Sequence, residues 1–206
     1  MFTPDGRGEQ APGRPAAFLD RDGTLNQAVP DPDSGMPESP LSVDDVRLLP
    51  GAAAAAGKLA DAGYALVCVS NQPAAAKGKV AVDQLLAVHE RALTLLAEQG
   101  IQVEISLLCL HHPDGVLGEL SRPCACRKPA PGMLLDAAAE LELDLGSSWM
   151  LGDTDTDIAA GHAAGARTVL IEYPPSAHKR SGTSTQELLA TDIGDAAAQL
   201  LGQRAR

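Results

Sequence analysis

The chain of 206 residues carries a formal net charge of −11, and 45% of its residues are hydrophobic. This length supports one sizeable core and is short for two ordinary domains. The acidic balance argues against nucleic acid or an anionic membrane as a partner, because phosphate-rich surfaces select for basic faces. It does not exclude a small phosphorylated metabolite, which a few cations and a metal ion at one site can bind.

The N-terminal segment 1–15 is polar and rich in Gly and Pro. It lacks the apolar run of a secretory signal, and no later run is long enough to cross a bilayer. We therefore expect a flexible segment over 1–15, a single domain over 16–206, a cytoplasmic location and a monomer.

Short β-like runs alternate with helical patterns along the rest of the chain, which predicts an α/β fold with a doubly wound, mostly parallel sheet. The predicted strands cover 16–19, 64–69, 103–108, 149–151 and 167–171. An alanine-rich helix opens at Pro50-Gly51 and closes at Gly63. The other predicted helices cover 84–99, 132–141, 158–164 and 192–201.

Three connecting segments are predicted to be irregular. Segment 27–42 contains four prolines and must be a loop. Segment 111–131 is rich in Pro, Gly, Cys and His, and 173–186 is interpreted as a mobile connector. Little sequence is left between the motifs for a separate cap domain, so we expect an open site.

Polar residues follow directly on several predicted strands. Asp20, Ser70 and Asp153 each lie just past the carboxyl end of one. Ligands of open α/β sheets bind beyond these ends, so the three side chains should converge on one crevice.

The first strand leads into Asp20-Arg21-Asp22-Gly23-Thr24. Two carboxylates at i and i+2 before a Gly turn can supply a nucleophile and a proton donor for phosphoryl transfer, and can help to bind a divalent cation. A solvated Asp-Gly turn is the alternative for this motif taken alone.

Two further elements could hold a phosphoryl group. The Ser70 hydroxyl and nearby N–H groups could donate to its oxygens, although Ser-Asn after a strand is also an ordinary turn. In Arg127-Lys128-Pro129 the lysine could neutralise its charge, although a solvated Arg-Lys pair is the usual alternative.

Segment 152–157 places Asp153, Asp155 and Asp157 at a strand-to-helix junction. These carboxylates would repel one another unless a cation is present, and hard oxygen ligands favour Mg²⁺. A helix N-terminus that attracts acids explains Asp155 or Asp157, but it explains Asp153 less well.

Four soft ligands lie in two short pairs joined by a loop over 109–126: Cys109, His111, Cys124 and Cys126. Three thiolates and an imidazole suit a tetrahedral, structural Zn²⁺, which would pin the loop and direct Lys128. Unmetallated core thiols are the alternative, and His112 is an alternative ligand to His111.

Together these motifs, in this order and each at a strand end, resemble the haloacid dehalogenase-like hydrolase superfamily over residues 16–172. The resemblance implies a Rossmann-like fold and a Mg²⁺-dependent phosphatase that forms an aspartyl-phosphate on Asp20. It also implies that Asp22 is the general acid/base, and that Ser70 and Lys128 position the phosphoryl group.

The same resemblance implies the metal ligands. Asp20, Asp153 and the backbone carbonyl of Asp22 would hold the Mg²⁺. Asp157 would support Lys128 or a metal-bound water.

The zinc segment and the following 127–134 resemble the branch that contains D-glycero-D-manno-heptose 1,7-bisphosphate phosphatases and histidinol-phosphate phosphatases. The resemblance implies release of the C7 phosphate of a heptose bisphosphate, with histidinol phosphate as the alternative substrate. The expected substrate contacts are Arg21, Asn71, Gln72, Arg127 and Lys128.

The sequence departs from this branch at 27–40, which replaces a shorter sugar-contacting segment, at 73–78, and at Thr154, where the heptose enzymes tend to carry lysine. These departures bear on sugar recognition and leave the core motifs untouched. A zinc-stabilised binding protein with an inactive site is a further alternative. Retention of the whole catalytic set argues against it: Asp20, Asp22, Ser70, Lys128 and Asp153.

Overall fold

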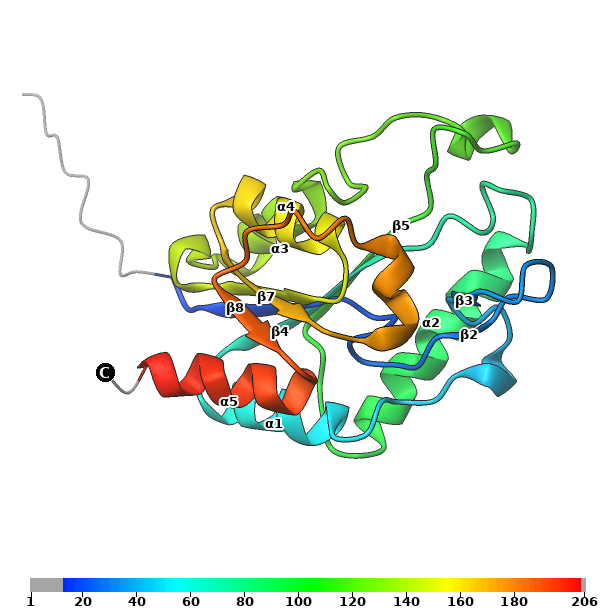
Figure 1. Ribbon diagram of the computed structural model, residues 1–206. Helices are drawn as coiled ribbons and strands as arrows, with labels where there is room; N and C mark the ends of the chain where they lie inside the picture. Colours follow the sequence, from blue (N-terminus) through cyan, green and yellow to red (C-terminus); the bar gives the residue numbers. More distant parts are fainter. Residues whose placement is uncertain (1–12, 205–206) are drawn as a thin grey trace, which may run out of the picture.

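Short apolar runs form a parallel sheet at the centre of the molecule. In the computed structural model, which describes residues 13–204, six strands follow the order β5-β4-β1-β6-β7-β8, and every neighbouring pair is parallel (Figure 1). Their bounds are β1 Ala16–Leu19, β4 Ala65–Asn71, β5 Ile105–Cys109, β6 Trp149–Gly152, β7 Arg167–Ile171 and β8 Leu188–Ala190. All residues of β1 and β6 are buried, as expected for strands that are covered on both faces.

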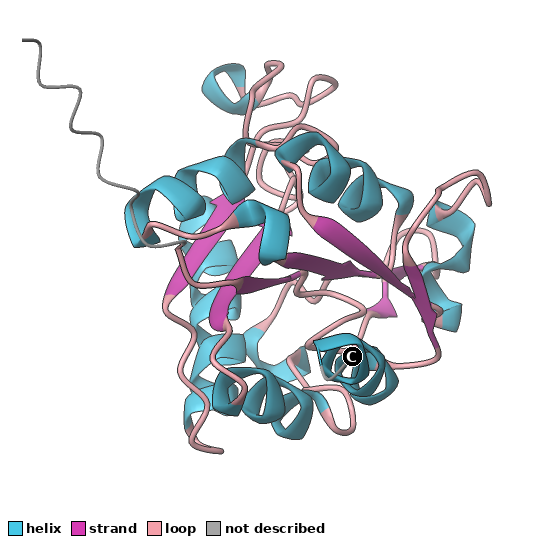
Figure 2. Cartoon of the chain, turned by 90° about the vertical axis from the view of Figure 1, so that its left-hand side faces the viewer, coloured by secondary structure: helices cyan, strands magenta, loops and turns pink. Residues whose placement is uncertain are grey.

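Helices cover both faces of this sheet, as Figure 2 shows. On one face lie α1 (Ala52–Asp61), α2 (Val82–Ala97) and α5 (Ile193–Arg204), and on the other lie α3 (Gly132–Leu141) and α4 (Asp155–Ala164). Side chains of β1 alternate between the two resulting cores: Ala17 and Leu19 pack in the first, and Ala16 and Phe18 in the second. The predicted doubly wound α/β fold is confirmed.

The predicted strands and helices are all present, with shifted ends. Helix α4 begins at Asp155, three residues before the predicted start, because Thr154 and Asp157 form a reciprocal capping box. Strand β8 was not predicted, because only three residues separate its polar neighbours and it pairs with β7 alone.

The proline-rich segment 27–42 is more ordered than a loop. Strands β2 (Val29–Pro30) and β3 (Pro37–Glu38) pair antiparallel, and Asp31 accepts hydrogen bonds from the N–H groups of Asp33 and Ser34 between them. An ion pair from Lys79 to Asp31 ties this β2–β3 hairpin to the segment after β4. Within residues 13–204 the hairpin and the loop 109–126 are small additions, and neither forms a separate cap domain.

The connector after β7, which was interpreted from the sequence as mobile, contains a short regular element. Residues Pro174–Lys179 form a short 3-10 helix, η4. Ser176 and Arg180 donate hydrogen bonds to the backbone oxygen of Asp153, at 3.4 and 3.5 Å. The connector is therefore fastened to the residue that follows β6.

Most of the predicted flexible segment 1–15 lies outside the described residues, which begin at 13. Its last residues are hydrogen-bonded to the domain: the Arg14 oxygen accepts from the N–H of Asp144, and the Pro15 oxygen from the N–H of Ala65, at 3.0 and 2.9 Å. Over residues 13–204, every helix is too short or too polar to cross a bilayer.

Candidate active site

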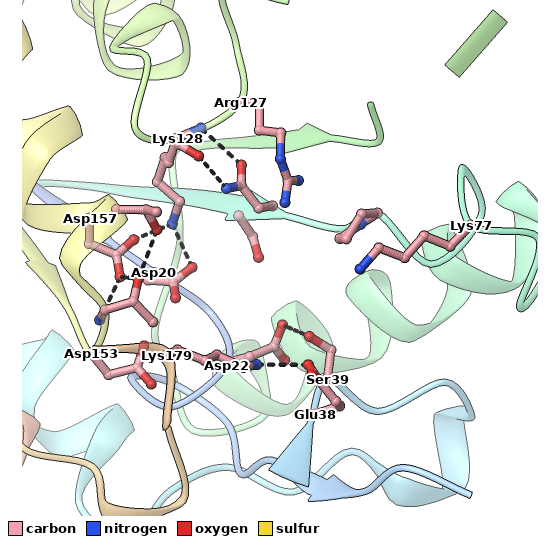
Figure 3. Close-up of a pocket in the computed structure, with 15 residues that line it drawn as sticks. Asp20, Asp22, Glu38, Ser39, Lys77, Arg127, Lys128, Asp153, Asp157 and Lys179 are labelled. Atoms are coloured by element: carbon pink, nitrogen blue, oxygen red, sulfur yellow. Dashed lines mark hydrogen bonds and ion pairs between the residues drawn. The ribbon is translucent and has the colours of Figure 1, made fainter. Parts of the chain in front are cut away.

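A cavity of about 270 Å³ opens at the carboxyl ends of β1, β4 and β6. Asp20 follows β1, Ser70 lies near the end of β4 and Asp153 follows β6, and all three line the cavity (Figure 3). The convergence predicted from the strand order is confirmed. Parallel neighbours in the sheet bring together residues that are up to 133 positions apart, from 20 to 153.

Three buried carboxylates meet at one wall of this cavity. Asp20, Asp153 and Asp157 each place an oxygen within 4.8 Å of the others. The Lys128 ammonium lies among them, 2.8 Å from Asp20 Oδ1 and 2.6 Å from Asp157 Oδ1, and it also donates to the Val69 oxygen at 2.8 Å. We call these four residues the acidic cluster. The cluster thus contains three carboxyl groups and one ammonium group, that of Lys128.

Burial and the neighbouring charges together shift the pKa values of three residues in the cluster. Burial raises the pKa of Asp20 to about 6, although Lys128 opposes the shift. Burial, with Asp20 and Asp157 nearby, raises the pKa of Asp153 well above its usual range. Burial alone would lower the pKa of Lys128, but Asp157 and Asp20 outweigh it and raise that pKa. Without a further cation, the raised pKa values favour protonation of Asp20 and Asp153.

The cluster fits a hard divalent cation. Oδ1 of Asp153 is buried and has no hydrogen-bond partner among the described residues. Both oxygens of Asp157 are engaged, one by Lys128 and the other by Thr154, whose hydroxyl lies at 2.6 Å. Asp20 and Asp153 are thus the carboxylates best placed to hold Mg²⁺, which prefers oxygen ligands. Gly23 packs so close to Asp153 that a Cβ there would lie 2.1 Å from Oδ2.

Asp22 lines the same cavity but lies in a separate network of hydrogen bonds. Its carboxylate accepts from Arg21 Nη2 at 2.9 Å and from Asn26 Nδ2 at 2.9 Å. Ser39 Oγ and Gln72 Nε2 donate to Oδ2 at 2.8 and 2.6 Å. Burial raises the pKa of Asp22, but Arg21 and the hydrogen bonds outweigh burial and hold that pKa below its usual value. The carboxylate is therefore ionised, and it lies outside the acidic cluster.

Two of the predicted substrate contacts do not reach the cavity. The Arg21 and Gln72 side chains are both 1% exposed and are not among the cavity lining. Arg21 instead pairs with Asp22, and Gln72 bridges Asp22 and the Ser70 hydroxyl, at 2.6 and 2.9 Å. The structure places both residues behind the cavity wall, where they orient its polar groups.

The other predicted contacts, Asn71, Arg127 and Lys128, do line the cavity. The Asn71 amide clamps the backbone of Lys128: Nδ2 donates to its oxygen at 2.9 Å, and Oδ1 accepts from its N–H at 3.0 Å. Arg127 Nη1 donates to the His111 oxygen at 3.2 Å. Asn71 thus positions a cation that belongs to a different segment.

The predicted soft ligands also come together. One atom from each of Cys109, His111, Cys124 and Cys126 lies within 4.8 Å of the others. The Sγ atoms are 3.2 to 3.5 Å apart, close to the roughly 3.8 Å edge of a tetrahedron with Zn–S bonds of about 2.3 Å. This Cys/His cluster could therefore bind Zn²⁺.

The structure also decides between the two candidate histidines. His111 Nδ1 lies 3.4 Å from Cys126 Sγ, inside the Cys/His cluster. His112 Nδ1 instead accepts a hydrogen bond from the N–H of Asp114 at 3.1 Å. His111 is thus the residue that completes the cluster.

Several cavity residues were not predicted from the sequence. They come from the β2–β3 hairpin, the segment after β4 and η4: Glu38, Ser39, Lys77 and Lys179. None of these residues follows a predicted strand, so strand-end reasoning could not find them. The one available signal was that 27–40 and 73–78 depart from the pattern of the resembled family.

Comparisons with known proteins identify the family. A relative from Yersinia pestis, named D-glycero-beta-D-manno-heptose-1,7-bisphosphate 7-phosphatase, is 40% identical over 181 residues, covering 88% of this chain and 92% of the relative. The chain belongs to the HAD-like hydrolases. The HAD-hydrolase-like family model matches residues 125–196. A relative of the same name from Escherichia coli K12 is 37% identical over 157 residues, covering 76% of this chain and 78% of the relative.

Solved structures agree with this HAD-like assignment. The D,D-heptose 1,7-bisphosphate phosphatase of B. bronchiseptica, in complex with magnesium and phosphate, has a TM-score of 0.74 at 30% identity, over 92% of this chain and 99% of that one. A HAD-like phosphatase from Mesorhizobium loti has a TM-score of 0.74 at 33% identity, over 94% and 90%. The predicted enzyme class, a phosphoric monoester hydrolase, is confirmed.

Proposed function

We propose that this HAD-like phosphatase is Mg²⁺-dependent and releases the 7-phosphate of D-glycero-D-manno-heptose 1,7-bisphosphate, through an aspartyl-phosphate on Asp20. The observation that carries the proposal is the acidic cluster, which lines the cavity with a buried nucleophile and a buried ammonium. The substrate follows the names of the relatives that are 37 to 40% identical.

The first step is attack by a carboxylate oxygen of Asp20 on phosphorus. The bond from phosphorus to the sugar oxygen breaks, and Asp22 supplies the proton that the leaving oxygen needs. Asp22 is ionised in the free protein. It takes up a proton from solvent when the negative charge of the bound substrate raises its pKa, and this is the proton that the leaving oxygen receives. In the second step a water attacks phosphorus, Asp22 accepts its proton and the Asp20 carboxylate is restored.

Several groups hold the phosphoryl oxygens during both steps. Lys128, which lies beside Asp20, would neutralise their charge, and the Ser70 hydroxyl would donate to them from the carboxyl end of β4. Asp20, Asp153 and the backbone carbonyl of Asp22 would hold Mg²⁺, which supplies positive charge against the oxygens of the transferring group. Arg127, which also lines the cavity, would contact the substrate.

The Cys/His cluster has a structural role in this proposal. Its ligands would complete a tetrahedral Zn²⁺ site with no vacant position, so the metal would not contact substrate. Cys126 precedes Arg127 and Lys128 directly in the chain. A zinc ion that holds Cys126 in place would therefore also hold the backbone of Arg127 and Lys128 in place.

The proposal extends to the setting of the enzyme. Cys109, Cys124 and Cys126 would bind Zn²⁺ as reduced thiolates, which fits a reducing compartment and supports the cytoplasm as its location. The monomeric state stays a prediction.

The test is a kinetic screen of phosphate release with Mg²⁺ present, on the heptose 1,7-bisphosphate, the heptose 7-phosphate and histidinol phosphate. We expect the bisphosphate to have the highest kcat/KM, with ³¹P NMR showing that the phosphate at position 1 remains. A preference for histidinol phosphate would contradict the proposed substrate but agree with the proposed phosphatase mechanism. Equal trace rates in the wild type and in Asp20→Asn would instead favour a binding protein with an inactive site.

A further inference from the structure

An ion pair between η4 and the β2–β3 hairpin lines the active-site cavity. Lys179 Nζ lies 2.7 Å from Glu38 Oε2, and both side chains line the cavity. Lys179 ends η4, and Glu38 ends β3. Figure 3 shows the pair beside Asp22 and Asp153, with Arg127 and Lys77 on other sides of the cavity.

Each partner of this pair is fixed to a residue of the reaction centre. Ser176, three residues before Lys179, donates to the Asp153 oxygen at 3.4 Å. Ser39, next to Glu38, donates to Asp22 Oδ2 at 2.8 Å. Lys179 and Glu38 are therefore placed at the cavity by short backbone links to Asp153 and Asp22.

The pair contributes little to stability, because it is accessible to water. The side chains of Lys179 and Glu38 are 35% and 43% exposed, and ion pairs at such positions add little to the stability of a protein because water screens them. A dianionic phosphate can therefore replace Glu38 as the partner of Lys179 at small cost. Its charge-assisted hydrogen bond to the ammonium would be stronger than the original pair.

We propose that Lys179 binds the second, non-reacting phosphate of the substrate and that Glu38 is its partner in the free enzyme. Lys179 is then a residue that determines specificity for bisphosphates over monophosphates. Glu38 increases this specificity. A ligand must displace the Glu38 carboxylate to pair with Lys179, and the carboxylate repels any anion that binds nearby without forming that pair. The inference rests on the proposed function and names the group that recognises the far end of the substrate.

The test compares the heptose 1,7-bisphosphate with the heptose 7-phosphate, which differ only by the phosphate at position 1. Equilibrium binding is measured by calorimetry in an Asp20→Asn background, where turnover does not interfere. We expect Lys179→Ala to weaken binding of the bisphosphate about tenfold, the size of one charge-assisted hydrogen bond, and that of the monophosphate by less than about twofold. Lys179→Arg should restore most of the loss, and Glu38→Gln should tighten the bisphosphate by about threefold.

Lys58→Ala is the matched control, since Lys58 is exposed on α1, away from the cavity lining. It should bind both sugars as the parent does. An unchanged ratio of bisphosphate to monophosphate affinity in Lys179→Ala, or no binding of the bisphosphate to the parent, would overturn the inference. If the wild type hydrolyses both sugars but Lys179→Ala leaves the affinity ratio unchanged, the inference fails and the proposed function stands. If the affinity ratio changes as expected but the wild type hydrolyses neither sugar, the proposed function fails and the role of Lys179 in binding stands.

Discussion

The two metal-ligating clusters of this protein differ in what holds their ligands in place. The acidic cluster is built on strand ends, and the sheet register brings Asp20 and Asp153 together. The Cys/His cluster gathers ligands from a loop over 109–126, whose regular structure is limited to the end of β5 and one short 3-10 helix, Gly118–Leu120. The first cluster has a scaffold that exists without metal. The second has no comparable scaffold, so its metal should help to form it.

The acidic cluster should therefore matter mainly for catalysis and the Cys/His cluster mainly for stability. Loss of a ligand in the acidic cluster should remove activity and leave the fold intact. Loss of a ligand in the Cys/His cluster should loosen the fold first, with activity following.

The largest expected effect is that of Asp20→Asn on turnover. The variant keeps an acceptor for Lys128 but loses the nucleophile, so kcat should fall by about 10⁴-fold or more. Phosphate release is the measurement, and Asp61→Asn, an exposed acid on α1, is the control with the same charge change. A loss of less than about tenfold would show that Asp20 is not the nucleophile.

Disruption of the Cys/His cluster should come next, and it should act on stability. Cys109→Ala removes the ligand that belongs to β5, and we expect the Tm to fall by on the order of 10 °C, equivalent to a few kcal/mol. Differential scanning calorimetry of zinc-loaded protein measures this. Cys68→Ala is the control, since Cys68 is a buried thiol outside the cluster. Equal Tm values for zinc-loaded and zinc-stripped wild type would contradict the comparison.

Asn71→Ala should have an intermediate effect, a loss of kcat, because Asn71 fixes the position of Lys128 between the two clusters. The amide clamp on Lys128 is lost while Lys128 itself remains, so kcat should fall by about 30-fold from the misplaced cation. Steady-state kinetics measure it, and Asn71→Asp, which keeps only the acceptor, should retain part of the rate. An unchanged kcat in Asn71→Ala would mean that the Cys/His cluster alone orients Lys128.

The smallest expected effect concerns pH and the stability of metal-free protein. The pKa of Asp20 is about 6 in the folded state against 3.8 in the reference state, so the folded protein binds the proton more tightly. Ionisation of Asp20 therefore costs stability as pH rises from about 4 to 6, about 3 kcal/mol in all, of which about 2 kcal/mol is lost between pH 4.5 and 7. Asp20→Asn should show no such cost. Chemical denaturation at pH 4.5 and 7 compares them, and an identical pH dependence in both proteins would refute the raised pKa.

The sequence predicted Asp20 and Asp153 of the acidic cluster because each directly follows an apolar run. Such runs can be located from composition, and parallel strands must align their carboxyl ends, so Asp20, Ser70 and Asp153 could be brought together without coordinates. The Cys/His cluster could be predicted for a different reason. Thiols and imidazoles at short spacing have few other uses in an irregular segment.

The rest depends on side-chain direction and on loops, which periodicity does not report. Arg21 lies between two strand-end acids in sequence, yet its side chain turns inward to Asp22 and away from substrate. Glu38 and Lys179 reach the cavity through the β2–β3 hairpin and η4, which are held by side-chain hydrogen bonds to Asp22 and Asp153. No pattern in the sequence specifies those bonds.

The most direct test of the central claim is to trap the phosphorylated enzyme. Wild-type protein would be mixed with the heptose bisphosphate and Mg²⁺, quenched in acid within milliseconds, digested and analysed by peptide mass spectrometry. The account predicts a phosphoryl group on Asp20, formed at a rate no slower than turnover and missing from Asp20→Asn. Full turnover with the phosphoryl group on another residue, or with no phosphorylated residue at any time point, would contradict the account.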